Sequence, residues 1–409
     1  MLVPEKQKKL TINLPNQTKS LPYGALFALA SAYFMVGTAS LVVVGLADPI
    51  MGELQISPPF IGYLVSIFAI SFAVTAPIAI SVFGDFPRVH LLLTGLVLMA
   101  CSLGLGATSA SYGMLFLSRF LLAIGAAVVS PVCAAVASSI VPPEHQGKAL
   151  ALSFSGLTIS TVVGVPLASL AGTLFDWRLV FWVLALLCLL TALLVKYSVS
   201  DRSAGGRLPL FAMVETIFSP AKVSALGTTL TQMAAQFITY ALIAIYLVEQ
   251  FDIPPTSVSI ALMLFGVGGV AGNLIASQLI DRIGGRRLYR ISTIGMGASL
   301  LILWLFTGQA IIGFLSLLFW PVFGMMFQPA QQQKMGRLDP ERQNLMFSLN
   351  ASFLYLGMSL GSWFGSVLYD VIGSVWLPLA SLSVLVVSYG LNFWSEQAED
   401  QVSSAETSE

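Results

Sequence analysis

Charged residues, histidine and cysteine are all scarce in this sequence of 409 residues. Asp, Glu, Lys and Arg together make up 9% of the chain, and there are only two histidines and three cysteines. A water-soluble domain needs a polar surface, and so small a charged fraction could not cover one. The composition therefore excludes a soluble globular protein and indicates a chain whose solvent is lipid.

The same scarcity excludes most kinds of enzymatic chemistry. Both histidines, His90 and His145, fall in predicted loops, so no Ser–His–Asp arrangement can be assembled. Cys101, Cys133 and Cys188 stand inside apolar runs without the spacing of metal ligands. There is no glycine-rich phosphate loop, and the basic residues are not interleaved with aromatic ones. We therefore expect no enzyme, no metal site, no cofactor and no nucleic-acid partner.

Long apolar runs dominate the rest of the sequence, which is 56% hydrophobic with a mean hydropathy of +0.87. A helix needs about 20 mostly apolar residues to cross a hydrocarbon core about 30 Å thick. The runs lack the alternating polarity of barrel strands. An all-α membrane protein with twelve transmembrane helices is therefore predicted, over residues 22–46, 59–83, 90–108, 112–140, 149–172, 178–197, 222–248, 257–280, 288–307, 310–330, 344–369 and 374–395.

The basic residues gather on one side of this predicted topology. The odd-numbered connections hold only Arg178, whereas the even-numbered ones hold Arg88, Lys148, Lys196, Arg202, Arg207, Lys222, Arg282, Arg286, Arg287, Arg290, Lys334, Arg337 and Arg342. Cytoplasmic loops of membrane proteins carry an excess of Lys and Arg. We therefore expect a multi-pass protein of the cell (inner) membrane with both termini in the cytoplasm.

The longest connection, residues 198–221, divides the predicted helices into two bundles of six. The first bundle is expected over 22–197 and the second over 222–395, with a cytoplasmic linker between them. Residues 1–21 and 396–409 are expected to form disordered cytoplasmic tails. The second helix of each half is followed by a similar loop, Gly84–Arg88 and Asp281–Arg287, which indicates an ancestral duplication. Such repeats enclose a central site near the membrane midplane.

Several stretches resemble the major facilitator superfamily, and within it the twelve-helix drug–proton antiporters, including sugar-efflux-like members. The loop Asp281–Arg287 is similar to the family's loop between the second and third helices of a half, and 84–90 is a degraded copy. Arg119 resembles the arginine of helix 4, and residues 156–182 resemble the antiporter signature of helix 5. The resemblance covers about residues 22–395. It implies two pseudo-symmetric six-helix halves and alternating access of a small solute.

Arg119 lies inside the predicted helix 112–140, where an arginine costs about 2.5–3.5 kcal/mol on insertion scales. It should therefore face protein or a water-filled cavity, and the resemblance favours a role in proton coupling. Snorkelling toward the helix end is the alternative. The first helix is neutral between Gly37 and Ser40, which leaves Asp48 as the best carboxylate for proton coupling, provided that burial raises its pKa. A solvated aspartate at the helix end is the alternative.

The two similar loops are candidates for a cytoplasmic gate. Their carboxylates could accept helix N–H groups or pair with arginine across the interface between the halves, and such contacts would break when the halves rock. The alternative is that the basic residues only anchor the topology. The candidates are Asp85, Arg88, Asp281, Arg282, Arg286 and Arg287.

Helix 149–172 has small residues at every fourth position, namely Gly156, Ser160, Gly164, Ala168 and Gly172. Small residues on one face allow close helix packing in lipid. Pro166 removes a backbone hydrogen bond and should kink the helix. A bent helix packed against its counterpart in the other half could seal a leak path, and generic close packing is the alternative.

Substrate-binding residues are expected among polar and aromatic side chains inside the spans. Gln232, Gln236 and Tyr240 are spaced four residues apart and should share one helix face. Such side chains face either a neighbouring helix or the cavity, because buried amides need partners. The other candidates are Tyr33, Thr38, Trp320, Gln328, Asn350 and Tyr355.

Together these features predict a secondary active transporter that moves a small, amphipathic or weakly charged solute by alternating access. Proton-coupled efflux by a monomer is the main hypothesis, with the solute, protons and the lipid bilayer as partners. A proton-coupled symporter importing a sugar or organic acid is one alternative. A non-transporting receptor or scaffold on the same fold is another.

Overall fold

The computed structural model describes residues 21–201 and 219–406, apart from residue 341. These residues form helices and no strand, which confirms the predicted fold class. Residues 1–20 of the expected N-terminal tail and residues 202–218 of the expected linker lie outside the described ranges.

The helices before the linker are α1 (Tyr23–Gly45), α2 (Ala47–Leu54), α3 (Pro59–Phe83), α4 (Arg88–Ala107), α5 (Tyr112–Ser139), η1 (Pro143–His145), α6 (Gln146–Ile159), η2 (Ser160–Gly164), α7 (Val165–Leu174) and α8 (Trp177–Ser198). Those after it are α10 (Pro220–Tyr240), α11 (Ile243–Phe251), α12 (Pro255–Ile283), α13 (Gly285–Leu305), α14 (Ala310–Leu338), α15 (Gln343–Ile372), η3 (Ser374–Trp376) and α16 (Leu377–Glu406).

In the described part of the chain, eleven helices are long and apolar enough to cross a membrane. A twelfth span results when α10 and α11 are taken together, since the chain bends by 48° between them. The single run predicted over 222–248 is thus a broken span. The run predicted over 22–46 ends at Gly45, and the short helix α2 continues from Ala47.

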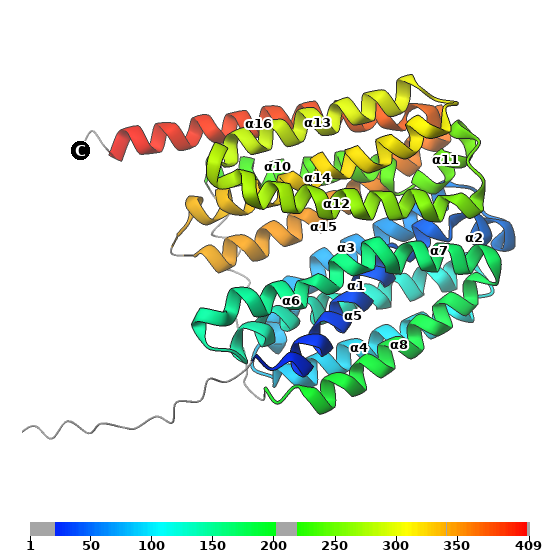
Figure 1. Ribbon diagram of the computed structural model, residues 1–409, viewed down its shortest axis with the longest axis horizontal. Helices are drawn as coiled ribbons and strands as arrows, with labels where there is room; N and C mark the ends of the chain where they lie inside the picture. Colours follow the sequence, from blue (N-terminus) through cyan, green and yellow to red (C-terminus); the bar gives the residue numbers. More distant parts are fainter. Residues whose placement is uncertain (1–20, 202–218, 341, 407–409) are drawn as a thin grey trace, which may run out of the picture.

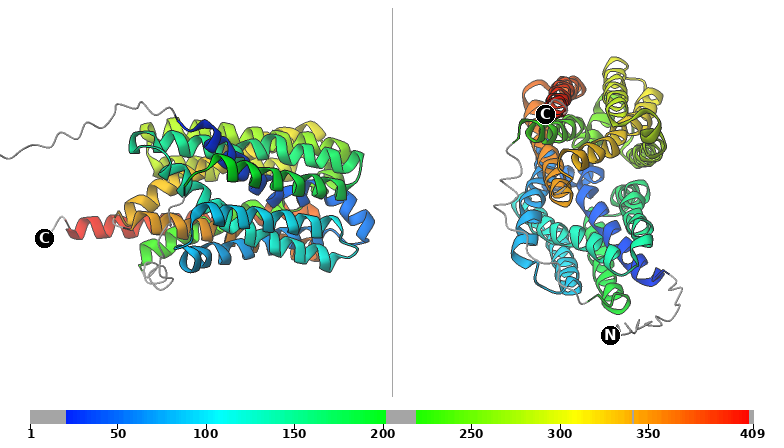
Figure 2. Two further views of the ribbon diagram at one scale, coloured as in Figure 1. Left: turned by 90° about the horizontal axis from the view of Figure 1, so that it is seen from below. Right: turned by 90° about the vertical axis from the view of Figure 1, so that its left-hand side faces the viewer.

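Helices α1 to α8 pack mainly with one another, and so do helices α10 to α16 (Figure 1). Two seams join these bundles: α3 packs along α15, and η2 and α7 pack along α12. The right-hand view in Figure 2 shows the two bundles on either side of a central region. This arrangement places parts of α1, α6, α10, α12 and α15 around one common space.

The two ends of the molecule differ in charge. The basic end is defined by Arg88, Lys148, Lys196, Lys222 and Arg337, which lie at or near the ends of α4, α6, α8, α10 and α14. The opposite end carries α2 and α11, which contact each other across the two bundles. The ribbons of the two bundles diverge toward the basic end (Figure 1).

Helix 149–172 is interrupted by a π-helical turn rather than by a simple proline kink. The turn η2 covers Ser160–Gly164, and Pro166 stands in the first turn of α7 directly after it. A π turn shifts the hydrogen-bonding pattern by one residue and so accommodates a position without a backbone N–H. The segment Pro143–Leu174 is therefore one continuous candidate membrane span, despite the π-helical turn.

The expected disordered tail at residues 396–409 needs correction, because α16 continues to Glu406. The start of this extension is held by a polar contact. Glu396 accepts hydrogen bonds from Arg290 at 2.7 Å and from Asn392 at 2.8 Å. An acidic side chain that looked solvated in the sequence therefore ties α16 to α13.

A stripe of glycines on α15 lets this helix touch the backbone of α10. A Cβ atom at Gly357, Gly361 or Gly365 would overlap the carbonyl oxygens of Leu230, Ala234 and Ile238, in that order. Close backbone approach of this kind is the usual role of small residues spaced by four in membrane helices. The stripe fixes the position of α10 within the second bundle.

The ion pair Lys222–Asp339 joins the start of α10 to the loop between α14 and α15. The Lys222 ammonium donates to Asp339 at 2.7 Å and thereby holds the pKa of that carboxyl below its usual value. The pair therefore stabilises the fold at neutral pH. This contribution is lost as pH falls below the ordinary carboxyl range, about 4, through the lowered pKa.

We expect Asp339→Asn to lower the melting temperature slightly at pH 7, since solvent screening limits such pairs to about 1 kcal/mol or less. The difference from wild type should shrink as pH is lowered through the acid range. Thermal unfolding of both proteins in detergent between pH 7 and pH 3 measures it. A difference that stays constant or grows toward acid would contradict the assignment.

Candidate functional site

A cavity of about 290 Å³ lies between the two bundles. Its walls come from α1, α6 and η2 of the first bundle and from α10, α12, α14 and α15 of the second. The polar side chains that line it are Ser40, Thr158, Ser160, Thr161, Gln236, Tyr240, Asn273, Gln328 and Tyr355. The described lining residues include no Asp, Glu, Lys, Arg or His, so the cavity is polar in places but carries no formal charge.

Gln236 and Tyr240 occupy one wall of the cavity, one turn apart on α10. Gln236 is 2% exposed, and its amide oxygen has no hydrogen-bond partner among the described residues. Tyr240 packs against Phe265 of α12, with ring centroids 4.3 Å apart. Behind them, Trp320 packs edge-on against Phe265 at 5.4 Å. An unsatisfied amide thus lies beside an aromatic wall.

Tyr355 of α15 also lines the cavity and stacks on Phe72 of α3, with ring centroids 3.8 Å apart. Nearby on the same seam, Ser66 and Ser359 exchange hydrogen bonds, each hydroxyl donating to the other's carbonyl oxygen at 3.0 Å. Because α3 and α15 belong to different bundles, these contacts join the bundles beside the cavity.

The structure brings together only part of the predicted substrate site. Gln236, Tyr240, Gln328 and Tyr355 line the cavity, as expected. The remaining candidates do not line it, because they face neighbouring helices. The residues to be corrected are Gln232, Asn350, Tyr33, Thr38 and Trp320.

Each corrected residue has a packing role in the structure. Gln232 contacts Met296 and accepts from Ser388 at 3.3 Å, and Asn350 accepts from Thr229 at 2.6 Å. Tyr33 donates to the Ser130 carbonyl at 2.8 Å. Thr38 is buried against Gly164, and Trp320 lies behind Tyr240. The polar groups of Gln232, Asn350 and Tyr33 thus join helices of one bundle, whereas the Thr38 hydroxyl and the Trp320 indole N–H are buried without a partner among the described residues.

Sequence reasoning missed several cavity residues. Asn273 of α12 is the clearest, because an amide in the middle of an apolar run is a visible signal. Ser40, Thr158 and Thr161 were not distinguishable from the many hydroxyl side chains that bond their own helix backbone.

Arg119 is completely buried and is held by backbone carbonyls rather than by a carboxylate. Its guanidinium donates to the carbonyls of Ala39 and Ser40 at 2.5 Å each, and it lies 4.7 Å from the ring centre of Phe68. The snorkelling alternative is therefore wrong. Arg119 does not line the cavity, but it fixes the backbone of Ser40, which does.

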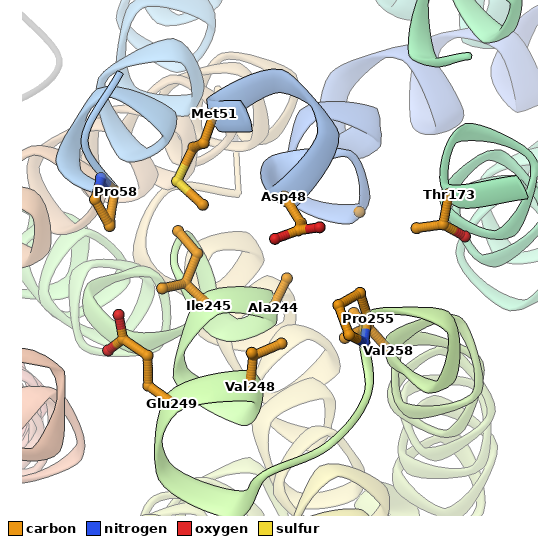
Figure 3. Close-up of a pocket in the computed structure, with 11 residues that line it drawn as sticks. Asp48, Met51, Pro58, Thr173, Ala244, Ile245, Val248, Glu249, Pro255 and Val258 are labelled. Atoms are coloured by element: carbon orange, nitrogen blue, oxygen red, sulfur yellow. The ribbon is translucent and has the colours of Figure 1, made fainter. Parts of the chain in front are cut away.

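Asp48 lies in the first turn of α2, at the opposite end from the basic residues. It is exposed, whereas the sequence-based hypothesis required it to be buried. Figure 3 shows Asp48 and Glu249 on the two sides of a smaller pocket of about 160 Å³, between α2 and α11. Tyr369 and Ser374 donate hydrogen bonds to the Glu249 carboxylate. The pocket thus receives one carboxylate from each bundle.

The candidate gate residue with a defined ion pair, Arg88, binds a partner next to its own bundle and not in the other one. Arg88 pairs with Asp201 at 3.4 Å, and Asp201 also accepts from Ser139 at 2.6 Å. Asp85 and the Asp281, Arg282 and Arg287 side chains are exposed, and Arg286 borders a small recess between α13, α14 and α16. The latch across the two bundles stays a prediction.

The glycines of helix 149–172 pack against α1 of their own bundle, not against the other half as expected. A Cβ atom would overlap the Ala30 carbonyl at Gly156, the Thr38 side chain at Gly164 and the Leu46 side chain at Gly172. Contact with the second bundle comes from other residues of η2 and α7, and in η2 the Thr161 carbonyl faces Gly266 of α12. The glycine stripe therefore positions α1 rather than sealing the interface.

The end of this motif has a different structural role. The Asp176 side chain accepts from the Arg178 backbone at 2.8 Å and so caps α8. Arg178 and Trp177 then both bind the Glu53 carboxylate of α2, the indole at 2.6 Å. The motif thereby anchors α2 at the opposite end.

Comparison with known proteins agrees with this architecture. The family model of the Major Facilitator Superfamily matches residues 28–222 and 224–408. A chloramphenicol resistance protein of Streptomyces lividans is 32% identical over 63% of this chain and 67% of its own length. The inner membrane transport protein YdhP of Escherichia coli strain K12 is 28% identical over 92% of this chain and 97% of its own.

Among solved structures, a bacterial homologue of the human lysosomal transporter Spinster superposes with a TM-score of 0.79 at 16% identity. The match covers 93% of this chain and 98% of that structure, and it concerns the fold. The family match spans both bundles and most of the chain. The protein therefore belongs to the Major Facilitator Superfamily and is a multi-pass membrane transporter, not an enzyme.

Proposed function

We propose that the protein is a secondary active transporter that exports a small amphipathic solute from the cytoplasm in exchange for protons. The observation that carries the proposal is the uncharged cavity of about 290 Å³ between two bundles whose main contacts with each other run along two seams. Such a cavity can face either side of a membrane in turn when the bundles rock. The chloramphenicol resistance protein among the relatives favours export as the direction.

The basic end is proposed to face the cytoplasm, because Lys and Arg are retained on that side of the membrane. Both chain ends would lie on the cytoplasmic side. The residue ranges 22–197 and 222–395 are proposed as the two moving units, with the protein active as a monomer.

Proton coupling is proposed to involve Asp48, assisted by Glu249 and, at a distance, by Arg119. Asp48 and Glu249 face one pocket from different bundles (Figure 3). Two ionised carboxylates repel each other, and binding a proton removes that repulsion. Protons from the outside would therefore favour closure of this end. Release of the proton after the cavity has emptied would reverse the effect.

Transport into inverted membrane vesicles tests the direction and the coupling. We expect vesicles that contain the protein to accumulate radiolabelled chloramphenicol when their interior is made acidic, and a protonophore should abolish the accumulation. Asp48→Asn should lose the accumulation but keep downhill exchange, because the solute cavity is unchanged.

Asp370→Asn is the matched control, since Asp370 is an exposed carboxylate near the end of α15 that does not line either pocket. Labelling of Gln309→Cys, but not Arg287→Cys, by an impermeant maleimide on intact cells checks the orientation. Accumulation in right-side-out vesicles instead would establish import by symport. The absence of any solute movement in either kind of vesicle would favour a receptor or scaffold.

A further inference from the structure

We propose that the central cavity selects an uncharged solute with an apolar body and a hydroxyl or amide group, and that Gln236 binds that polar group. This inference rests on the proposed function, because it names the class of solute for the same cavity. It restricts the expected solutes, which were amphipathic or weakly charged molecules, to neutral ones. It also assigns the choice of solute to one side chain.

The first observation is the absence of charge from the cavity wall. The described lining residues carry hydroxyls, amides, methionines and aromatic rings, without an acidic or basic side chain. A charged solute would lose its hydration on entry and find no opposite charge to compensate. A neutral solute avoids that cost, so the wall discriminates against cations and anions alike.

The second observation is the unsatisfied amide of Gln236. This side chain lines the cavity, is 2% exposed and leaves its buried oxygen without a partner among the described residues. A buried amide without its hydrogen bonds is costly, and a primary amide offers both donors and an acceptor. A solute hydroxyl or amide that pairs with Gln236 would recover this cost. A solute without such a group would leave it in place.

The third observation is the character of the remaining wall. Tyr240 and Phe265 form an aromatic surface on one side, and Tyr355, stacked on Phe72, forms another. The methionines Met233, Met325 and Met358 also line the cavity. Aromatic rings favour flat apolar groups, and flexible thioethers adapt to different shapes. The cavity therefore suits an aromatic or similarly compact apolar body.

Binding to the purified full-length protein in detergent tests the selection by charge. The probes are chloramphenicol, which is neutral, its deacylated amine, which is cationic, and its hemisuccinate, which is anionic. The diacetate blocks both hydroxyls but keeps the amide, so it separates the two hydrogen-bonding groups. We expect titration calorimetry to give chloramphenicol the highest affinity. The diacetate should bind more weakly than chloramphenicol but still measurably through its amide, and the two ions should show no measurable binding.

The proposed class is overturned if the amine or the hemisuccinate binds as tightly as chloramphenicol, or if chloramphenicol does not bind. These measurements need no proton gradient, so they are separate from the test of export. If the protein binds chloramphenicol selectively but moves no solute, only the proposed function is overturned. If it exports the cationic amine, only the proposed selectivity for neutral solutes is overturned.

Gln236→Leu tests the assignment to this side chain. We expect an affinity for chloramphenicol at least about tenfold lower than wild type, together with an unchanged or higher melting temperature without solute. The second effect follows because leucine removes an amide that has no partner. A purely structural glutamine would instead lose stability when replaced and leave the preference among the probes unaltered.

Gln232→Leu is the matched control, because Gln232 lies one turn earlier on α10 and contacts Met296 and Ser388 away from the cavity. It should keep the wild-type affinity. Gly324→Ala is a second variant, and it retains the amide of Gln236. Its new Cβ would lie 3.2 Å from the Gln236 oxygen and would push that oxygen aside. Wild-type affinity in both Gln236→Leu and Gly324→Ala would overturn the role of Gln236.

Discussion

Replacing Gly361 by leucine is expected to abolish the folded protein. Gly361 is the middle of three glycines on α15 that touch the backbone of α10, and even a Cβ atom there would overlap the Ala234 carbonyl oxygen. Backbone within a helix cannot move aside as a flexible side chain can. Overpacking of a well-packed interior typically costs about 1–3 kcal/mol, and a leucine against backbone should exceed that range.

The consequence extends to the candidate site, because α10 carries Gln236 and Tyr240. Size-exclusion chromatography of the detergent-extracted variant should show aggregate or no monodisperse peak. Gly390→Leu on α16 is the control, since a Cβ there would meet nothing within 4 Å. A Gly361→Leu protein with the wild-type elution profile and melting temperature would refute the close approach of α15 to α10.

Two substitutions of Arg119 are expected to destabilise the protein to different extents. The chemically more similar residue, lysine, should have the larger effect. Arg119→Lys should lower the melting temperature more than Arg119→Met does. The guanidinium reaches the carbonyls of Ala39 and Ser40 with separate nitrogens, and a lysine ammonium cannot reproduce this fork. A buried charge that loses its partners typically costs about 3–5 kcal/mol, whereas methionine buries no charge at all.

Both substitutions should also reduce proton-driven chloramphenicol accumulation at least about tenfold, equivalent to about 1.4 kcal/mol, because Arg119 fixes Ser40 at the cavity wall. Thermal unfolding and transport in the same membranes measure the two effects. Arg290→Lys serves as the control, since Arg290 pairs with Glu396 but is nearly half exposed, and surface pairs contribute little. Equal stability of the lysine and methionine variants would contradict a buried, carbonyl-bound guanidinium.

The fold was predictable because lipid imposes a simple requirement on the sequence. A helix that crosses a bilayer must satisfy its own backbone and be apolar over about 20 residues, so the spans stand out in the hydropathy. The predicted run 222–248 nevertheless contains the bend between α10 and α11, which no proline or glycine marks. The extension of α16 to Glu406 was missed because the Arg290–Glu396 contact joins distant segments.

The candidate site was predictable only in part, because a helix inside a bundle is apolar on every side and its rotation cannot be inferred from periodicity. Gln232 and Gln236 show the limit. Four residues advance a helix by slightly more than one full turn, so the two amides differ by only a small rotation about α10. That rotation directs one toward Met296 and the other into the cavity. The glycines of α15 also repeat every four residues, yet they were not among the residues predicted to bring helices together.

An uncharged wall around an uncharged cargo has an electrical consequence. Moving one elementary charge across the membrane potential involves about 2.3 kcal/mol per 100 mV. A cavity lined by Gln236, Asn273 and Gln328 that carries a neutral molecule moves no net charge through this field. The membrane voltage would then act on the exchange only through the accompanying protons. The conformational change with solute bound would proceed at the same rate in polarised and depolarised membranes.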